Sequence, residues 1–550
     1  MSWFVPSRQE SDCFGKRVRQ TCRTVKLASA CLRLMTASLI PAVSLHAAER
    51  PTESSSASAS ASAPHAETQP ETQVQWRDWS DATVAQARAA GRPIYLFVGS
   101  ELSELSRATL RQTLANAQTA TWLNAHFSCL MIDADAQPVV ASLAHHFLER
   151  VKQRRGLPMH LWLTPDFEPF DGAGYLPPSE EWGQPGFLKN ARSALEAWTV
   201  DPARARALAA EARTQMSPLA LVDGPTDPST RLDQSASAWI AAIDAVHGGF
   251  GSAPKLPEPE VLRFLVRRNA AGREAALNAA RSLVKGAARD SVEGGFYRRT
   301  IDEAWTEPYL QKTLLDQARI ALALFDVADL GGDVQLRTAG LESLDFALRF
   351  LRRPDGSFAA ALDGTREERT DPTVRPRFVQ TGQATTGVLG LFLGALQRAR
   401  RIDEGRYAAA ASGLADILRR SAQSADGTLA RHPGSAVRAA PADYFAVALG
   451  LRALANPKDA ALAERLIARV QDTYFDSLSG LYQASPPTPP AGIALRVPAS
   501  GEIPSAEALA LIAGVPEATA ARIRRALLSA IEYDPQPSGD SLLALSTKTP

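Results

Sequence analysis

GLPMHLWLTPDFEPFDGAGYLPP, residues 156–178, gives the clearest indication of fold in the N-terminal part of the chain. Two apolar runs, Met159–Leu163 and Phe170–Tyr175, flank the turn Thr164-Pro165-Asp166. Short apolar runs bounded by turn residues are typical of buried strands. Pro158 stands directly before the first run, and cis peptide bonds are essentially confined to the bond that precedes proline. The stretch therefore predicts a strand–turn–strand unit entered through a candidate cis-proline, Pro158.

The segments on either side of this unit predict an alternation of strands and helices. Apolar runs predict strands, and apolar residues at helical spacing predict helices with one buried face. The predicted elements are a strand at Pro93–Val98, a helix at Ser103–His126, a strand at Phe127–Ile132, and helices at Val139–Val151 and Trp182–Trp198. With the two strands above, this is the order of a thioredoxin-like fold, which we place at residues 75–215.

From about Thr230 onward the sequence is helical and rich in Ala and Leu, with few strand candidates. A turn recurs after successive helical stretches, with glycine where a left-handed helix cap is expected and an apolar residue near it. The five copies are His247–Phe250, Glu293–Phe296, Asp355–Phe358, Asp426–Leu429 and Ser479–Tyr482. Their spacing fits about twelve helices paired as hairpins. We predict that residues 225–550 form a closed ring of six hairpins, with an open helical array as the alternative.

The N-terminus has the order of a secretory signal. Seven basic residues up to Arg33 precede an uncharged run at Leu34–Leu45, and small residues follow at Ala47-Ala48. Residues 49–74 include a Ser/Ala tract that is typical of a flexible linker. We expect residues 1–48 to be a signal segment and the mature chain to be periplasmic or secreted. A disordered tail or a short membrane anchor is the alternative.

The composition of the chain argues against several classes of binding partner and cofactor. Lys and Arg number 60 and Asp and Glu number 59, so no strong positive field favours nucleic acid. No apolar run after the signal is long enough to span a membrane. Three of the four cysteines precede residue 48, and Cys129 lies in an apolar run where a free cysteine behaves as a small hydrophobe. We therefore expect no disulfide, no metal site and no cofactor.

Several long stretches together resemble one known family. They are RPIYLFVGS (92–100), WLNAHFSCLMIDAD (122–135), the opening stretch (156–178), GGFGSAPKLPEP (248–259), EGGFYRRTIDEAWTEPYLQKTLLDQA (293–318) and GEIPSAEALAL (501–511). In this order they are similar to the spermatogenesis-associated-protein-20-like family. That resemblance implies a multidomain chain, α/β plus all-α, with a thioredoxin-like fold followed by an (α/α)6 six-hairpin, glycosidase-like toroid.

The chain departs from the family at the redox position. Where the family has a CxxC motif, this sequence has Ser103-Glu104-Leu105-Ser106. Dithiol exchange requires a thiolate and a resolving thiol, which Ser103 and Ser106 cannot supply. We interpret Ser103 as a helix cap and the module as redox-inactive.

The toroid departs from the family as well. The family's His-Phe-Glu-Lys-Met-Leu-Tyr-Asp-Gln pattern reads Tyr309-Leu310-Gln311-Lys312-Thr313-Leu314-Leu315-Asp316-Gln317 here, without the histidine and the glutamate. These losses favour a degenerate site.

Residues near the turns and helix starts are the candidates for a ligand site. Aromatic faces beside charged groups are suited to sugar binding, and paired carboxylates or two histidines are suited to glycoside cleavage or epimerisation. The ligand-binding candidates are Arg298, Trp305, Tyr309, Lys312, Asp443 and Tyr444. The catalytic candidates are Asp302, Glu303, Asp316, Asp363 and His247, and His432 is the other histidine of the toroid. Solvated carboxylates, surface histidines and ordinary salt bridges are the alternatives for all of them.

We conclude from the sequence that the toroid binds or processes a carbohydrate-like ligand in its funnel, without dithiol redox activity. The alternative is a non-catalytic scaffold in which both sites are degenerate and a peptide or protein partner is held. Fold analogy is a weak argument for function, so both hypotheses stay open at this point.

Overall fold

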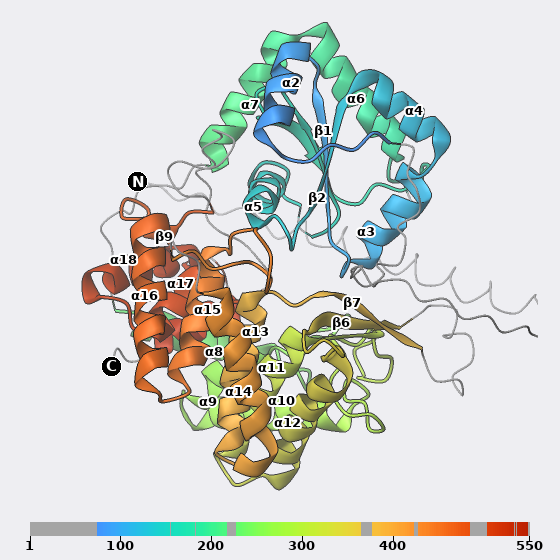
Figure 1. Cartoon of the computed structure of the whole chain (residues 1–550). Coiled ribbons are helices and arrows are strands. Elements are labelled where there is room, and N and C mark those ends of the chain that lie inside the picture. The colour runs from blue at the N-terminus through green and yellow to red at the C-terminus, as the bar shows by residue number, and fades with distance from the viewer. Residues whose placement is uncertain are drawn as a thin grey trace, which may run out of the picture. The chain divides into compact units, whose positions relative to one another are not determined.

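The computed structural model describes residues 74–154, 156–181, 183–216, 227–364, 377–422, 427–484, 503–532, 534 and 536–547 (Figure 1). Contacts divide the chain into residues 1–66 and residues 67–550. The predicted signal at 1–48, and the predicted linker at 49–74 apart from its last residue, lie outside the described residues. The predicted sheet and the predicted helical ring both belong to the second unit.

A four-stranded mixed sheet forms the core of the first module. Its order is β2-β1-β3-β4, in which β1 and β2 are parallel and the other two pairs are antiparallel. The strands are β1 (Ile94–Gly99), β2 (Ser128–Asp133), β3 (Met159–Leu163) and β4 (Pro169–Ala173). The Leu157–Pro158 peptide bond, directly before β3, is cis. The thioredoxin-like strand order expected from the sequence is therefore present.

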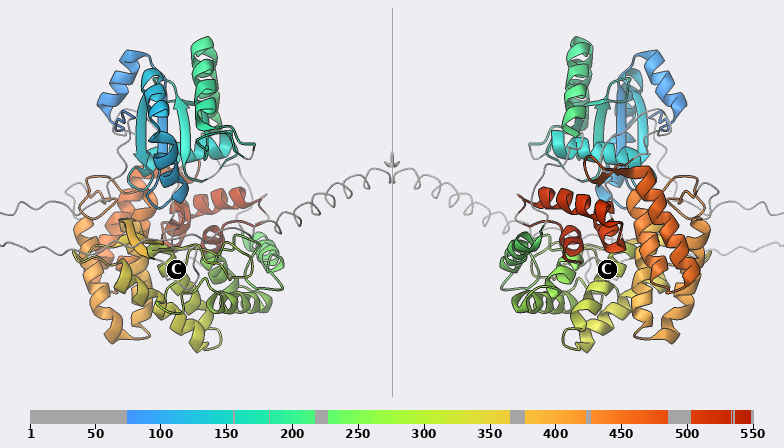
Figure 2. Two further views of the ribbon diagram at one scale, coloured as in Figure 1. Left: turned by 90° about the vertical axis from the view of Figure 1, so that its right-hand side faces the viewer. Right: turned by 90° about the vertical axis from the view of Figure 1, so that its left-hand side faces the viewer.

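Helices cover both faces of this sheet, as the two views in Figure 2 show. Alternate residues of a strand point to opposite faces. Ile94, Leu96 and Val98 therefore pack in one apolar cluster, while Tyr95 and Phe97 pack in another. The covering helices are α2 (Asp81–Ala90), α4 (Ala117–His126), α5 (Pro138–His146), α6 (Phe187–Val200) and α7 (Pro202–Met216).

The predicted single helix at Ser103–His126 was wrong, because the structure divides it. It consists of α3 (Glu104–Ala108), a π-helical segment at Thr109–Leu114, and α4. The division falls at Asn116, whose side chain accepts hydrogen bonds from the backbone N–H groups of Gln118 and Thr119. Such a side-chain cap starts a new helix, and apolar spacing alone does not reveal it.

Twelve helices, α8 to α19, make up the second module within the described residues. They are α8 (Ser229–Ala241), α9 (Pro259–Val266), α10 (Ala270–Lys285), α11 (Leu314–Ala328), α12 (Val334–Phe346), α13 (Thr386–Arg400), α14 (Glu404–Ser421), α15 (Pro441–Arg452), α16 (Pro457–Tyr474), α17 (Ala506–Ala513), α18 (Glu517–Ile531) and α19 (Gly539–Ser546). None of the helices in the described part of the chain has both the length and the apolar character that a membrane span requires.

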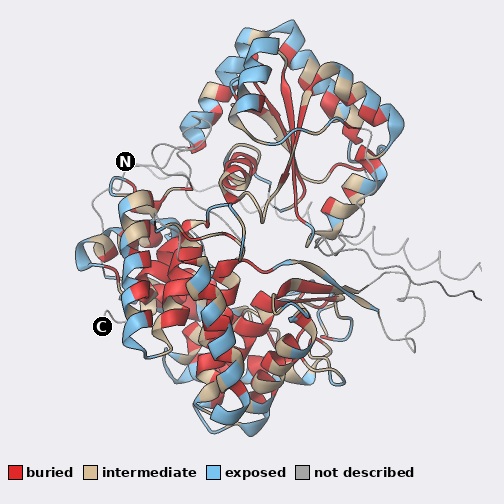
Figure 3. Ribbon diagram, viewed as in Figure 1, coloured by how far each residue is buried: buried red, intermediate tan, exposed pale blue. Residues whose placement is uncertain are grey.

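Alternate helices of this set form a closed inner ring. Helix α9 packs on α11, and the series continues through α13, α15, α17 and α19 until α19 packs back on α9. The indole Nε1 of Trp239 in α8 donates to the Pro537 carbonyl oxygen at 3.2 Å, which joins the first hairpin to the last. Figure 3 shows buried residues on these inner helices and exposed residues on the outer ones. The closed toroid is thus confirmed, and the open array is wrong.

Long loops lie at one end of the ring and short ones at the other. Residues 242–258 lead from outer helix α8 to inner helix α9, whereas residues 267–269 suffice to join α9 to α10. The recurring glycine turns lie in the long loops, and Gly249, Gly295 and Gly356 have positive φ as the cap motif requires. The N-terminal ends of the inner helices therefore share one end of the toroid with these loops, and we call this end the mouth.

The long loops also contain strands that the helical pattern concealed. A three-stranded antiparallel sheet has the order β5-β6-β7, and a small pair consists of β8 and β9. The strands are β5 (Gln311–Thr313), β6 (Ala359–Gly364), β7 (Phe378–Gln383), β8 (Phe475–Asp476) and β9 (Leu481–Tyr482). The sequence pattern did not locate these strands, because such short segments gain their pairing from distant parts of the chain.

Candidate functional site

Acidic residues stand in the first turn of five of the six inner helices described. They are Glu260 in α9, Asp316 in α11, Asp443 in α15, Glu507 in α17 and Asp540 in α19. Because the inner helices start at the mouth, these carboxyl groups lie at the same end of the ring. Helix N-termini also favour negative charge.

Arg319, in the second turn of α11, holds several of these groups together. Its Nε donates to Oε1 of Glu260 at 2.7 Å, and its Nη2 pairs with the other oxygen of that carboxylate. Burial acts to lower the pKa of Arg319, but Glu260, Asp316 and Asp540 raise it above its usual value. The guanidinium is therefore a permanent positive charge facing three carboxyl groups.

The local structure fixes Asp316 and Asp540. Thr313 donates its hydroxyl to Oδ2 of Asp316 at 2.7 Å and accepts the Asp316 backbone N–H at 3.0 Å, a reciprocal cap at the start of α11. The backbone N–H of Ser505 donates to Oδ2 of Asp540 at 3.0 Å. Both aspartates are half-buried, so a ligand at the mouth can reach them.

Burial raises the pKa of two glutamates in this group. Burial raises the pKa of Glu507 to about 7, and the nearby Asp540 adds to the effect. Burial likewise raises the pKa of Glu258, with Glu260 contributing. We call Glu258, Glu260, Asp316, Glu507 and Asp540, together with Arg319, the carboxylate cluster. It combines the permanent charge of Arg319 with Glu507, whose carboxyl group can hold a proton near neutral pH.

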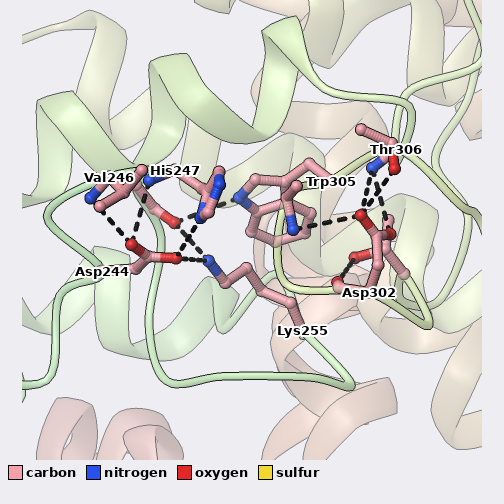
Figure 4. Close-up of polar contacts among 10 residues, drawn as sticks. Asp244, Val246, His247, Lys255, Asp302, Trp305 and Thr306 are labelled. Atoms are coloured by element: carbon pink, nitrogen blue, oxygen red, sulfur yellow. Dashed lines mark hydrogen bonds and ion pairs between the residues drawn. The ribbon is translucent and has the colours of Figure 1, made fainter. Parts of the chain in front are cut away.

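Another polar group surrounds the first glycine turn (Figure 4). Lys255, which has no exposed surface, donates to Oδ2 of Asp244 at 2.5 Å and to the Gly248 carbonyl oxygen at 2.9 Å. His247 places Nδ1 3.1 Å from the same carboxylate oxygen. His432, in the loop before α15, is a separate half-buried residue whose pKa is lowered by burial and then by Arg431. The two histidines lie in different loops, His247 before α9 and His432 before α15.

Asp302 and Trp305 hold the loop between the second glycine turn and β5. The Asp302 carboxylate accepts hydrogen bonds from the Thr306 hydroxyl and from the backbone N–H groups of Glu307 and Thr306, and despite burial these bonds lower its pKa to about 2. Trp305 is buried, and its Nε1 donates to the Gly248 carbonyl oxygen at 3.2 Å. Glu303, between them, is exposed. The polar groups of Asp302 and Trp305 are thus used to stabilise this loop.

Lys312 repeats the arrangement of Lys255 in the next hairpin. It is fully buried and donates to Oδ2 of Asp290 at 2.8 Å and to the Gly294 carbonyl oxygen at 3.0 Å. Its Nζ also lies 4.2 Å from the centre of the Phe346 ring. Lys312 lies in β5, before α11 begins, whereas Asp316 lies in the first turn of α11.

Asp363, Tyr309 and Arg298 meet around Gln311. The Gln311 Nε2 donates to Oδ1 of Asp363 at 2.8 Å, and its Oε1 accepts from Arg298 at 3.3 Å. Tyr309 stacks under Arg299, whose Cζ lies 4.6 Å from the ring centre. Burial, followed by Glu104 and Asp363, raises the pKa of Tyr309. The structure therefore brings three sequence-predicted residues together, at the edge of the β5–β6 sheet.

Asp443 and Tyr444 are buried at the start of α15. Oδ2 of Asp443 accepts from Arg431 at 2.5 Å and from the Ala440 backbone N–H at 2.8 Å. The Tyr444 hydroxyl accepts the Leu429 N–H at 3.0 Å, and its ring belongs to the apolar core. These two residues hold the loop before α15 onto its helix.

The redox position of the first module contains no thiol in the described residues. Ser103 accepts the Ser106 backbone N–H at 3.2 Å and so caps α3, as the sequence predicted. Ser106 is buried. The buried Cys129 lies in β2, and burial raises the pKa of its thiol to about 12. Neither a dithiol nor a reactive thiolate is available in this part of the structure.

The sequence singled out Asp316 but missed Glu258, Glu260, Arg319 and Asp540. Acidic residues in a first turn are common because they complement the helix dipole, and some outer helices carry them too. Their position at the mouth follows from the alternation of inner and outer helices, which only contacts reveal. Over the described ranges, no three His, Cys, Asp or Glu side chains form a group suited to a metal ion.

Comparison with known proteins supports the family resemblance. The family described as "Protein of unknown function, DUF255" (Thioredox_DsbH) matches residues 56–217. Spermatogenesis-associated protein 20 of Mus musculus is 25% identical over 304 residues, which are 53% of this chain and 38% of the mouse protein. The Homo sapiens protein is 27% identical over 307 residues, covering 53% of this chain and 39% of the human protein. The matched part thus spans under half of these relatives.

Among solved structures, a sugar epimerase from a ruminal bacterium matches with a TM-score of 0.44 and 11% identity, over 58% of this chain and 97% of that chain. The GH76 α-mannanase BT2949 of Bacteroides thetaiotaomicron matches with a TM-score of 0.41 and 10% identity, over 58% of this chain and 94% of that chain. The predicted resemblance to the spermatogenesis-associated-protein-20-like family is confirmed by the sequence matches.

Proposed function

We propose that this chain, a thioredoxin-domain protein similar to spermatogenesis-associated protein 20, binds a carbohydrate-like ligand at the carboxylate cluster and performs no dithiol exchange. The observation that carries the proposal is the ion pair between Arg319 and Glu260 at the mouth of the ring, with Asp316 and Asp540 near enough to raise the pKa of the guanidinium further. Polar groups that several elements of a fold bring to one place are the default hypothesis for a binding site.

The chemistry of the cluster suits a polyhydroxylated ligand. Ionised carboxylates accept hydrogen bonds from hydroxyl groups, and a guanidinium donates several in a fixed plane. Asp316 and Asp540 are half-buried, and the Arg319 side chain keeps 25% of its surface exposed, so these groups are within reach of a ligand. Sugars offer both donors and acceptors and therefore match such a mixed set.

Isothermal titration calorimetry of the full chain with a panel of neutral and acidic oligosaccharides tests the proposal. Asp316→Asn should weaken binding of the responding sugar roughly tenfold, the effect of one lost charge-assisted hydrogen bond. Asp472→Asn, on the exposed face of outer helix α16, is the matched control and should bind as the unmodified chain does. Equal affinity of both variants would overturn the assignment of the site.

Turnover of a bound sugar requires groups that exchange protons near neutral pH, and Glu507 has the pKa for such a role. We propose carbohydrate processing as the extension of binding. Proton NMR of the responding sugar, incubated with the full chain, would show epimerisation or cleavage as new anomeric signals. A spectrum that stays unchanged over days would restrict the function to binding.

The absence of dithiol exchange has its own test. Ser103 serves as a helix cap and Cys129 is buried with a raised pKa, so neither can attack a disulfide. The full chain should leave the reduction of insulin by dithiothreitol at its uncatalysed rate. Acceleration that disappears in Cys129→Ser would contradict this part of the proposal.

A non-catalytic scaffold is the second candidate function. The observation that favours it is that several site residues expected from the sequence, among them Lys312, Asp302 and Asp363, are bonded within the chain. If it is correct, a folded chain should bind no sugar of the panel. A folded chain that binds one of them, with loss in Asp316→Asn, would exclude it.

We also propose export, because residues 1–48 have the order of a secretory signal. Cell fractionation followed by N-terminal sequencing of the mature protein tests this. An intact N-terminus in the cytosol would contradict it.

A further inference from the structure

We infer that the thioredoxin-like module is a fixed cover on one half of the ring's mouth, docked through the loop that has lost the family's dithiol. The loop runs from Gly99, at the end of β1, to Arg107 in α3. In the family that the sequence resembles, this loop carries the CxxC motif. Here it contacts the toroid of the same chain, and that contact replaces redox exchange as the task of the module.

The first docking point is Gln311 in β5. This residue is buried, and its Nε2 donates to the Leu102 carbonyl oxygen at 2.8 Å as well as to Asp363 at 2.8 Å. Arg107 lies 3.3 Å from the other oxygen of Asp363. One amide and one carboxylate of the toroid are therefore used to hold two residues of the module. Because Gln311 is almost fully buried, water cannot replace these bonds if they are lost.

The second docking point is Arg431, in the loop before α15. Its Nε donates to the Asp135 carbonyl oxygen at 2.7 Å, and its Nη1 pairs with Asp443 at 2.5 Å. The Arg431 carbonyl oxygen in turn accepts the Thr386 N–H at 2.8 Å. This point therefore links the loop after β2 to the starts of α13 and α15.

The module's two docking loops are also bonded to one another. The Ser100 hydroxyl donates to Oδ2 of Asp135 at 2.6 Å and accepts the Leu102 N–H at 3.0 Å. The carbonyl oxygens of Leu102 and Asp135 accept the hydrogen bonds from Gln311 and Arg431 of the toroid. Ser100 thus joins both docking points into one rigid unit on the module side.

The two docking points lie on one side of the mouth, and most of the carboxylate cluster lies on the other. They lie at the starts of α11, α13 and α15, whereas the carboxylate cluster draws most of its residues from α9, α17 and α19. A ligand would therefore enter on the side of α17, α19 and α9. This entry route rests on the proposed function, but the docking itself does not.

Hydrogen–deuterium exchange of the full chain tests the docking without any ligand. Gln311→Glu removes the donor to Leu102 and places a second carboxylate beside Asp363. Arg431→Ala removes the other link. Either variant should exchange at least about tenfold faster at residues 99–107 and 133–137, while β1 and β3 keep their protection. Arg281→Ala, which removes a surface ion pair with Asp333 on the outer helices, is the control and should change neither segment.

Restoring the thiols gives a second and independent test. Ser103→Cys combined with Ser106→Cys should yield a pair that leaves insulin reduction near the uncatalysed rate, because the loop faces the toroid. Adding Gln311→Glu and Arg431→Ala should accelerate the reaction several-fold. Unchanged exchange in the single variants, or full insulin reductase activity in the undisturbed double-cysteine chain, would overturn the inference. Sugar binding is measured separately, so its failure would leave these outcomes intact.

Discussion

At the scale of single residues, two buried lysines stabilise the glycine turns through ion pairs and hydrogen bonds. Lys255 and Lys312 are both fully buried, and each bonds an aspartate and a glycine carbonyl oxygen of its own repeat turn. The aspartates, Asp244 and Asp290, also accept backbone N–H groups of their turns. A buried charge is tolerated when it is paired and hydrogen-bonded in this way.

Lys312→Met should therefore destabilise the fold, because it leaves Asp290 without its cation in a mostly buried place. We expect a loss of about 3 to 5 kcal/mol in the free energy of unfolding, measured by urea denaturation. Arg281→Met removes an exposed cation from its pair with Asp333, whose carboxylate still accepts backbone N–H groups at the start of α12, and should cost less than about 1 kcal/mol. Equal losses of stability in the two variants would show that the buried ion pair of Lys312 with Asp290 does not stabilise the fold more than an exposed cation does.

Glu507 gives a pH-dependent prediction at the same scale. Its pKa in the fold is about 7, against an ordinary value of 4.5, so the folded state holds a proton that the unfolded chain releases. Its contribution to stability is greatest below about pH 4.5 and falls as the pH rises through about 7. Over that window the loss should amount to about 3 kcal/mol.

Glu507→Gln should remove this dependence, since an amide keeps an acceptor for the Tyr482 N–H but does not ionise. Urea denaturation at pH 5 and at pH 7.5 measures the effect. The unmodified chain should lose stability relative to the variant between the two values. Parallel pH profiles of the two proteins would contradict the buried, proton-holding glutamate.

At the scale of elements, the crossing of inner helices α13 and α15 depends on glycine. A Cβ on Gly390 would lie 2.5 Å from the Ala446 carbonyl oxygen, and one on Gly450 would lie 2.4 Å from the Gly390 carbonyl oxygen. Two backbones can approach this closely only where both lack a side chain. The close approach of α13 and α15 therefore depends on two glycines, although glycine has a low helix propensity.

Gly390→Ala should force the two helices apart and cost about 1 to 3 kcal/mol, in spite of the better helix propensity of alanine. Gly394→Ala lies one turn further along α13, where a Cβ meets nothing within 4 Å. That variant should gain up to about 1 kcal/mol. The two thermal unfolding curves should thus shift in opposite directions, and a shared direction would contradict the packing argument.

At the scale of the whole ring, closure depends on the last helix. A Cβ on Gly539 would lie 2.6 Å from the Val261 backbone nitrogen, so α19 meets α9 backbone to backbone. Arg231 in α8 adds a hydrogen bond from its Nε to the Ile531 carbonyl oxygen at 2.9 Å. The first and last hairpins therefore bury one another's apolar faces, which neither could do alone.

Gly539→Ala should loosen this junction. We expect a loss of about 2 kcal/mol and faster hydrogen–deuterium exchange in α9 and α19, because overpacking displaces the closing helix. Gly413→Ala, on outer helix α14 where a Cβ meets nothing within 4 Å, should leave exchange in both helices unchanged. Unaltered exchange in Gly539→Ala would indicate that closure does not depend on this contact.

The sequence predicted local features well, because they depend on neighbouring residues. Glycines in the turns, the Ser103 cap, the strand–turn–strand unit after Pro158 and the number of ring helices follow from patterns within short windows. The sequence did not predict that Asn116 starts a new helix, nor the strands β5, β6 and β7, whose pairing partners are far along the chain.

The candidate site was predicted only in part. Asp316 was chosen and lies in the carboxylate cluster, whereas Lys312, Trp305 and Tyr444 were chosen and are buried in loop or core packing. Residue type and nearness to a turn do not distinguish a side chain at the mouth from one that is buried in loop or core packing. The direction of a side chain in a toroid depends on which helices are inner, and that is a property of the closed ring.

The sequence by itself determined the two modules, the hairpin repeat and the loss of the dithiol, because composition, periodicity and motif content are local. Only the tertiary structure decided which carboxyl groups face Arg319 and which loops join the modules. The residues concerned, such as Glu260 and Asp540 or Leu102 and Gln311, are far apart in the chain. Their proximity arises only when the ring closes and buries its apolar faces.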